Sequence, residues 1–334
     1  VMVISHDRYF LDRTVTKIYD LEDGELQAYN GNYSAFVKEK EARLLAEFQQ
    51  FEEQQKKIKK MKAAIKRLRE WANRANPPNA GMHRRAGSME KALERMEKLD
   101  RPVIERKKMG LELDAGKRSG RDVVRMENVT KSFDGRVLFR EAGMHVRFGE
   151  RAAVVGENGT GKSTWLRMML GEERADEGKC ALGTGVNVGY LSQDGLPGDE
   201  NATVLEAFRE QTTMDEGKAR HVLAKFMFYG SQVFQRVKDL SGGEQMRLRF
   251  AQLMYQDVNF LILDEPTNHL DIDSREVLED ALEDFQGTLL AVSHDRYFLN
   301  KCFSRLFWLE NATMTVYEGD YTYARRKRSE RNGY

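Results

Sequence analysis

A glycine-rich run in the second half of the chain has the composition of a phosphate-binding loop. Gly156-Glu157-Asn158-Gly159-Thr160-Gly161-Lys162-Ser163-Thr164 follows the apolar run Ala152–Val155 and precedes the helix-like Trp165–Leu170. Glycines let backbone amides turn toward phosphate oxygens, and a helix N-terminus adds the positive end of its dipole. In this G-x-x-x-x-G-K-S pattern, Lys162 would reach the β- and γ-phosphates of a nucleotide, and the Ser163 hydroxyl would bind Mg²⁺. The alternative, a glycine-rich turn with only a steric role, is disfavoured because a strand and a helix flank the loop.

An acidic pair after a second apolar run could supply the other half of a hydrolytic site. Phe260–Leu263 is four apolar residues long, as expected of a buried strand, and Asp264-Glu265 follows it directly. Asp264 could hold Mg²⁺ through water, and Glu265 could polarise an attacking water as a general base. Such a pair is common by itself, but together with a phosphate loop it indicates nucleotide hydrolysis.

A third motif lies between these two and opens another helix. Leu240-Ser241-Gly242-Gly243-Glu244-Gln245 combines small residues with exposed amides, which suits an anion at a helix start. With Gln193, Asp271 and His294, the three motifs resemble those of the ATP-binding cassette (ABC) superfamily, in the same order along the chain. The resemblance implies an α/β P-loop NTPase fold with a mixed sheet and a helical lobe. It also implies ATP and Mg²⁺ as ligands.

The same resemblance gives each motif residue an expected role. Glu265, His294 and Gln193 would be catalytic, and Mg²⁺ would be held by Ser163, Gln193 and Asp264. Asp271 would belong to the D-loop of the family. Ser241, Gly242, Gly243 and Glu244 would contact an ATP held by another cassette. The expected ATP-binding residues are Phe133 (stacked on adenine), Gly156, Asn158, Gly159, Thr160, Gly161, Lys162, Ser163 and Thr164.

The chain also repeats its own end at its beginning. Ser5-His6-Asp7-Arg8-Tyr9-Phe10-Leu11 recurs as Ser293–Leu299, and the register then holds with a constant offset of 288 positions. Self-similarity at a fixed offset indicates duplicated architecture. Together with Pro266-Thr267-Asn268-His269-Leu270-Asp271, the duplicated motif resembles the ABC-F subfamily, whose members are soluble tandem ATPases that act on the ribosome. His6 would then be the switch histidine of a first cassette.

The repeat and the composition suggest four parts. Because the chain opens on Val1 and holds only the last piece of the first copy, we interpret it as a fragment. Short strand-like runs alternate with helical ones after about residue 120, and residues 203–255 are expected to be mostly helical, which indicates an α/β domain with a helical lobe. The expected parts are the end of a first cassette (1–33), a basic helical-hairpin linker (34–115), a complete second cassette (121–321) and a basic tail (322–334).

The expected linker has the pattern of a long helix that turns back on itself. Residues 34–73 contain no Gly or Pro, and apolar residues recur every seven positions, which predicts a helix with a narrow apolar seam. Asn76–Gly81 should end this helix, and Ser88 is expected to cap a second one. The turn would then carry His83, Arg84 and Arg85 as candidate RNA contacts. The seam positions are Leu44, Phe51, Ile58, Ile65 and Ala72.

Charge is distributed unevenly along the chain. Residues 36–110 hold 21 Lys and Arg against 11 Asp and Glu, an excess of +10, although the whole chain is only +1. Such a stretch is often just a solvated helical face, and the functional interpretation is attraction to a polyanion. Cys180 and Cys302 show no metal-ligand spacing and suit a reduced, cytoplasmic protein. No apolar run approaches the roughly 20 residues of a membrane-spanning helix.

The resemblance implies a ribosome-associated translation factor or an antibiotic-resistance protein that protects the ribosome. Residues 34–115 would contact rRNA and tRNA, and the missing first cassette would be a partner in cis. Three alternatives stay open: an ATPase subunit that drives a membrane transporter, a DNA-binding ABC ATPase, and a linker that is only a rigid spacer.

The resemblance also implies that ATP is sandwiched between the phosphate loop of one cassette and the signature segment of another. The chain contains each element once. We therefore expect weak ATPase activity from a monomer of this chain. Two copies could restore both sandwiches by pairing head to tail.

Overall fold

The computed structural model describes residues 1–22, 24–74, 79–96, 118–133, 135–192, 198–268 and 270–331. The chain divides into two compact units. The larger unit consists of Val1–Tyr9 and Lys108–Tyr334, and the smaller one of Phe10–Lys107.

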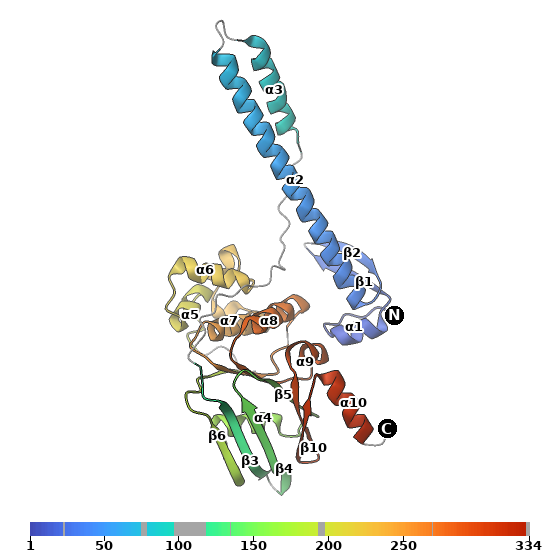
Figure 1. The fold of residues 1–334 in the computed structure, drawn as a ribbon, viewed down its shortest axis with the longest axis vertical. Coiled ribbons are helices and arrows are strands. Elements are labelled where there is room, and N and C mark those ends of the chain that lie inside the picture. Colours follow the sequence, from blue (N-terminus) through green and yellow to red (C-terminus); the bar gives the residue numbers. More distant parts are fainter. Residues whose placement is uncertain are drawn as a thin grey trace. The chain divides into compact units, whose positions relative to one another are not determined.

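The larger unit is built on a six-stranded mixed sheet in the order β11-β10-β5-β9-β8-β7, of which Figure 1 labels β5 and β10. Every neighbouring pair is parallel except β10 and β11, which form an antiparallel hairpin. All residues of β8 and β9 are buried, as expected of central strands that are covered on both faces. The strands are β5 (Arg151–Gly156), β7 (Val188–Leu191), β8 (Phe260–Asp264), β9 (Thr288–Val292), β10 (Arg305–Glu310) and β11 (Thr313–Glu318).

A second, antiparallel sheet has the order β4-β3-β6 and shares one core with the first. Its strands are β3 (Asp122–Phe133), β4 (Arg136–Arg147) and β6 (Glu177–Leu182). Helix α4 (Lys162–Leu170) contributes four buried residues to this core, which contains residues of both sheets. The Trp165 ring meets the Phe139 ring edge to face at a centroid distance of 5.0 Å, so aromatic packing joins α4 to β4.

Helices cover the opposite face of the central sheet and enclose a separate core (Figure 1). The stretch 203–255 is mostly helical, as its sequence predicts. The α/β class with a mixed sheet and a helical lobe is therefore confirmed. The elements are α5 (Val204–Gln211), α6 (Glu216–Lys225), the 3₁₀ turns η1 (Gly230–Phe234) and η2 (Val237–Asp239), α7 (Gly242–Met254), α8 (Ile272–Asp284), α9 (Arg296–Cys302) and α10 (Tyr321–Arg331).

The smaller unit contains a small antiparallel hairpin and two long helices. Strands β1 (Lys17–Glu22) and β2 (Glu25–Asn30) pair with each other, and α2 (Tyr33–Arg74) packs along α3 (Ala80–Glu94). Three of the five predicted seam positions, Ile58, Ile65 and Ala72, are buried, and Phe51 is half-buried. The side chain of Leu44 lies outside what the structure describes. Among the described residues of the chain, no helix has both the length and the apolar character that a bilayer crossing requires.

The predicted start of the second hairpin helix is wrong. The cap is Asn79, whose side chain accepts hydrogen bonds from the amides of Gly81 and Met82 at 3.0 and 3.2 Å. Ser88 lies inside α3, and its hydroxyl donates back to the carbonyl of Arg84 at 3.1 Å. Consequently His83–Arg85 lie in the first turns of α3, where all three are exposed, and not in the connecting turn. Residues 75–78 of that turn lie outside the described residues.

The sequence repeat is also a repeat of elements. Helix α1 (Arg8–Thr14) and strands β1 and β2 have the bounds of α9, β10 and β11 less 288 positions. The strand register is conserved as well, because Lys17 pairs with Asn30 as Arg305 pairs with Glu318. The same local sequence therefore forms the same helix and hairpin twice.

Candidate nucleotide-binding site

The glycine-rich loop runs from the end of β5 to the first turn of α4. Two of its glycines have no room for a side chain: a Cβ on Gly156 would lie 2.5 Å from the carbonyl oxygen of Leu309, and one on Gly161 would lie 2.7 Å from the Phe139 ring. Gly161 also has φ +102°, which L side chains rarely adopt, and it is the N-cap of α4. Because a glycine cap offers no side-chain acceptor to the first amides of α4, those amides are left for another acceptor, as at an anion-binding helix start.

Lys162 lies over the loop that it follows. It is buried, and its Nζ donates to the carbonyls of Gly156 and Glu157, both at 3.0 Å. Burial lowers the pKa of Lys162, while the nearby carboxylates of Glu265 and Asp264 raise it. The ammonium therefore lies close to both acidic residues, although these follow a different strand.

Asp264 ends β8 and is surrounded by hydroxyl groups. The Tyr190 hydroxyl, on the neighbouring strand β7, lies 3.4 Å from Asp264 Oδ2, and the Ser163 side chain is hydrogen-bonded to the same carboxyl group. Burial raises the pKa of Asp264, and its hydrogen bonds and the Lys162 charge oppose that rise. The strand order thus brings Ser163 of the loop next to Asp264.

Glu265 is buried and held in an unusual backbone conformation. Its φ is +49°, a left-handed value that costs about 1–3 kcal/mol at a non-glycine residue. Burial raises the pKa of Glu265 to about 7, while a hydrogen bond from the His294 amide lowers it. That amide donates to Oε2 at 3.3 Å, and Oε1 is buried and has no hydrogen-bond partner among the residues that the structure describes. The strained backbone aims a carboxyl group with one unsatisfied oxygen into the site.

The His294 ring lies against the same carboxyl group. Its Nε2 is 3.4 Å from Glu265 Oε1, and the imidazole is half exposed. Burial lowers the pKa of His294 below its usual value of 6.5, so the ring is neutral near pH 7. The contact is therefore a polar one between a neutral imidazole and a carboxyl group rather than an ion pair.

These oxygen ligands fit Mg²⁺ in a nucleotide complex. Mg²⁺ prefers hard oxygen ligands and is usually bound by one or two protein groups, several waters and the phosphates of the substrate. The Ser163 hydroxyl and the Asp264 carboxylate, which lie together, supply such a pair. In the described part of the chain no cluster of three or more His, Cys, Asp or Glu residues could form an all-protein cage. The residues thus suit a cation that arrives with phosphates.

The expected signature segment, Ser241–Glu244, is ordered by its own hydrogen bonds. Ser241 caps α7: its hydroxyl accepts from the Glu244 amide at 3.3 Å, and Glu244 Oε2 accepts from the Ser241 amide at 2.8 Å. Ser241 and Gly242 are exposed. An exposed segment, fixed by this reciprocal cap, thus begins a 13-residue helix.

The remaining predicted residues lie at separate places. Phe133 ends β3 and is 43% exposed, with Lys131 Nζ 4.7 Å from its ring centroid. Asp271 caps α8 through the amide of Ser274 at 2.7 Å. His6 is exposed, and Gln193 lies outside the described residues.

Three contributors to this region have no sequence motif. Tyr190 contacts Asp264, and Arg136 Nη2 donates to the loop carbonyl of Gly159 at 3.1 Å. A cavity of about 670 Å³ beside the loop is lined by Gly156, Thr160 and His294, and also by Trp308. Neighbouring strands and chain reversals bring these residues to the loop, so no local spacing could have revealed them.

Two family profiles match the chain, both described as "ABC transporter". One matches residues 19–113 and the other residues 139–268. The first covers most of the smaller unit, and the second runs from within β4 to three residues beyond Glu265.

Curated relatives align over nearly the whole chain. It is 40% identical to the protein YdiF and 34% identical to "Ribosome protection protein VmlR", both of Bacillus subtilis (strain 168), and 37% identical to "ABC transporter F family member 2" of Arabidopsis thaliana. Each alignment covers 99% of this chain, but 50%, 63% and 48% of the relative. The chain thus spans about half the length of the curated relatives it matches, or somewhat more.

Proposed function

The chain belongs to the F subfamily of ATP-binding cassette proteins, and on that premise we propose that it binds and hydrolyses ATP as part of a ribosome-associated factor. The observation that carries the ATPase proposal is the meeting of Lys162, Asp264, Glu265 and His294 at one end of the central sheet. Phosphate-binding, cation-binding and proton-accepting groups come from three strand ends there, as nucleotide hydrolysis requires.

The buried carboxyl group suits a general base. A base works best when its pKa lies near the working pH, and burial raises the pKa of Glu265 to about 7. We propose that Glu265 accepts the proton of the attacking water while the neutral His294 orients the water and the γ-phosphate. Lys162 and the amides of α4 would hold the phosphates. Gln193 is proposed as a further contact to water and Mg²⁺ on the strength of the motif order alone.

Bound Mg²⁺ would neutralise charge on the β- and γ-phosphates, and Ser163 with Asp264 are the residues proposed to hold it. The protein would supply the other polar contacts: the loop amides would bind phosphate oxygens, and the burial of Lys162 would strengthen its interaction with them. Phe133 is proposed to stack on adenine, with Lys131 already covering one side of its ring.

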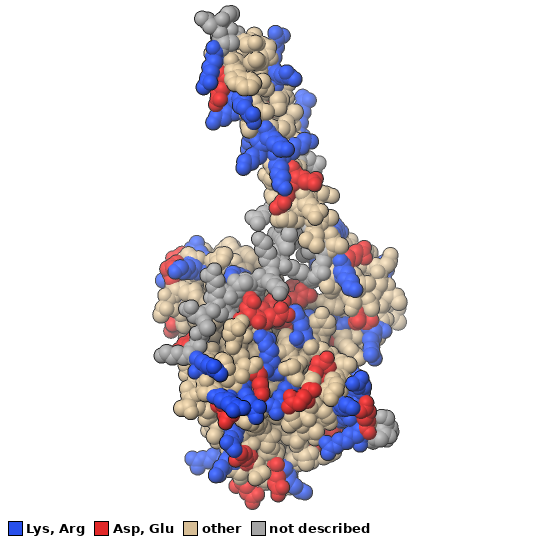
Figure 2. Space-filling view, in the orientation of Figure 1, with Lys and Arg blue, Asp and Glu red and all other residues tan. Residues whose placement is uncertain are grey.

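The hairpin is the part proposed to contact RNA. From Lys56 to Arg74, α2 holds nine Lys and Arg residues and one acidic residue, Glu70. Figure 2 shows Lys and Arg side chains spread over this part of the hairpin. Trp71 is 56% exposed among them and offers a ring for base stacking. A basic helix pair with an exposed aromatic suits a folded RNA, and the name of the relative VmlR supports the ribosome as its source.

Co-sedimentation tests this proposal. The variant Lys59→Glu/Lys60→Glu should weaken binding to ribosomes and make the salt dependence shallower, by about two in the slope of log K against log salt. Its matched control is Arg174→Glu/Lys179→Glu, which changes the charge equally on exposed residues of the larger unit. Retention on duplex DNA at the same salt, with no ribosome binding, would favour the DNA-binding alternative. Equal ribosome binding by the two variants would overturn the role of the hairpin.

A further inference from the structure

The two copies of the Ser-His-Asp-Arg-Tyr motif are folded by the same local hydrogen bonds. The Asp7 amide donates to the Ser5 hydroxyl at 3.1 Å, and the Asp295 amide donates to the Ser293 hydroxyl at the same distance. Each aspartate then accepts from the amide two residues later, at 3.0 Å for Asp7 and 2.9 Å for Asp295. The first copy is therefore ordered as a motif, even though it is a short segment at the edge of the larger unit.

The two copies also contact each other reciprocally. The guanidinium carbon of Arg8 lies 4.1 Å from the ring centroid of Tyr297, and that of Arg296 lies 5.1 Å from the ring centroid of Tyr9. Since Arg296 and Tyr297 are the repeat equivalents of Arg8 and Tyr9, each copy places its arginine over the tyrosine of the other. Reciprocal contacts of this kind are typical of a two-fold interface.

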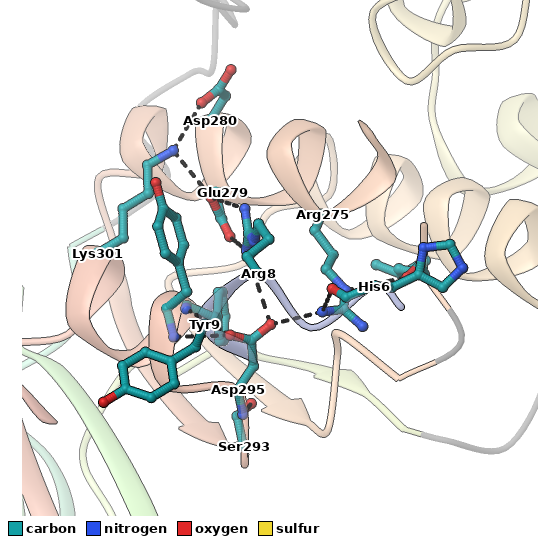
Figure 3. Close-up of polar contacts among 12 residues, drawn as sticks. His6, Arg8, Tyr9, Arg275, Glu279, Asp280, Ser293, Asp295 and Lys301 are labelled. Carbon is teal, nitrogen blue, oxygen red and sulfur yellow. Dashed lines mark hydrogen bonds and ion pairs between the residues drawn. The ribbon is translucent and has the colours of Figure 1, made fainter. Parts of the chain in front are cut away.

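Arg8 makes a second contact that anchors the first copy on α8 (Figure 3). Its Nη1 donates to Glu279 Oε2 at 3.2 Å, and its Nη2 bonds Oε1 of the same carboxylate. Both side chains are only 1% exposed. A two-point bond between buried charges is specific, because a single unpaired charge at that depth is strongly unfavourable.

The carboxylate keeps a second cation when Arg8 leaves. Lys301 Nζ lies 3.2 Å from Glu279 Oε2 and 3.3 Å from Asp280 Oδ1 (Figure 3). Burial lowers the pKa of Lys301, but these carboxylates outweigh it, and the net shift is upward, so Lys301 stays charged. The bond between Arg8 and Glu279 can thus break without leaving the buried carboxylate unpaired, as a reversible docking contact requires.

The docked segment is joined to the candidate hydrolytic site through Asp295. Arg275 Nη1 donates to the backbone carbonyl of His6 at 2.9 Å and to Asp295 Oδ2 at 3.1 Å (Figure 3). Asp295 directly follows His294, whose amide donates to Glu265. A displacement of His294 would therefore move Asp295 and, through Arg275, change the contact with the carbonyl of His6.

We propose that the Arg8–Glu279 bond is a docking contact that couples the first Ser-His-Asp segment to nucleotide binding at Lys162, Glu265 and His294. Arg8 acts here as a positioning residue, with Asp295 and Arg275 as the connection. The coupling rests on the proposed ATP binding, whereas the docking does not. Nucleotide that contacts His294 fixes Asp295 and thereby favours the docked segment.

Trypsin measures the docking directly, because it cleaves after Arg8 only when that side chain leaves its buried position. The readout is the initial ratio of peptide 1–8 to peptide 1–13, since Arg13 is exposed and provides an internal reference. Ratios are normalised to those of a synthetic peptide of residues 1–14.

Glu279→Gln should raise the ratio of peptide 1–8 to peptide 1–13 at least tenfold. Arg8→Lys, which cannot form the two-point bond, should do the same without altering the core. The matched control Asp280→Asn should leave it unchanged. Equal ratios for wild type, Glu279→Gln and Arg8→Lys would overturn the docking contact.

A second arm tests the coupling with a non-hydrolysable Mg·ATP analogue. Wild-type cleavage after Arg8 should slow at least threefold on saturation, and Glu279→Gln should weaken analogue binding by the same factor, because coupling free energies are reciprocal. A nucleotide-independent ratio in a chain that binds the analogue would refute the coupling. Failure of the wild type to bind the analogue would instead refute the proposed function, and the nucleotide-free arm would still decide the docking.

Discussion

Replacing Glu265 by glutamine should stabilise the protein at high pH although it removes a functional group. Burial raises the pKa of Glu265 from 4.5 to about 7. Below pH 4.5 the carboxyl group is protonated in both the folded and the unfolded state. As pH rises from 4.5 to 7, the unfolded state loses this proton more readily than the folded state, and the free energy of unfolding therefore falls. At 1.36 kcal/mol per pH unit, the difference corresponds to about 3 kcal/mol. Glutamine keeps the shape but does not ionise.

The assay is urea unfolding at pH 5 and pH 8, followed by fluorescence of Trp165 and Trp308 in a Trp71→Phe background. We expect the free energy of unfolding of Glu265→Gln, relative to the parent, to be about 2.5 kcal/mol higher at pH 8 than at pH 5, because part of the change already occurs below pH 5. Glu157→Gln, on an exposed loop glutamate, is the matched control and should respond alike at both pH values. A Glu265→Gln effect that is the same at pH 5 and pH 8 would refute a raised pKa of Glu265 in the folded protein.

Three further outcomes are expected. Gly161→Ala should lower the free energy of unfolding by about 2 kcal/mol or more in urea titrations, because its φ is +102° and its Cβ would meet the Phe139 ring at 2.7 Å, whereas Gly242→Ala, with open space around it, should not. Reversing both charges at Arg84 and Arg85 should weaken ribosome co-sedimentation and leave ATP titrations unchanged; a variant that binds ribosomes like wild type would favour a spacer role. ATPase activity per chain should be weak in dilute solution and rise with protein concentration if two copies pair head to tail, and light scattering that finds only monomer with constant specific activity would exclude pairing.

The parts of the fold that local patterns determine could be predicted from the sequence. The strand and helix around the glycine-rich loop, the buried strand that ends at Asp264 and the apolar seam of α2 depend on spacing within one segment. The structure has β5, α4 and β8 at the expected positions, and the seam is buried at Ile58, Ile65 and Ala72. The start of α3 was predicted wrongly because two cap residues compete. Asn79 bonds the free amides just after the prolines, so Ser88 falls inside the helix.

Contacts that depend on strand order could not be predicted. Tyr190 reaches Asp264 because β7 pairs with β8, and nothing in either segment specifies that neighbour. The sequence also identified Arg8 as part of a repeat but not its burial against Glu279, which is 271 positions away. Long-range partners of single charged residues require the fold itself.

Calorimetric titration with Mg·ATP, combined with a turnover assay, tests the proposed site most directly. Glu265→Gln should bind ATP as tightly as wild type and hydrolyse it about 10²–10⁴-fold more slowly, because only the proton acceptor is removed. Lys162→Ala should lose tight binding, since the buried ammonium holds the phosphates. Equal nucleotide affinity in wild type and Lys162→Ala would contradict the assignment of the phosphate loop.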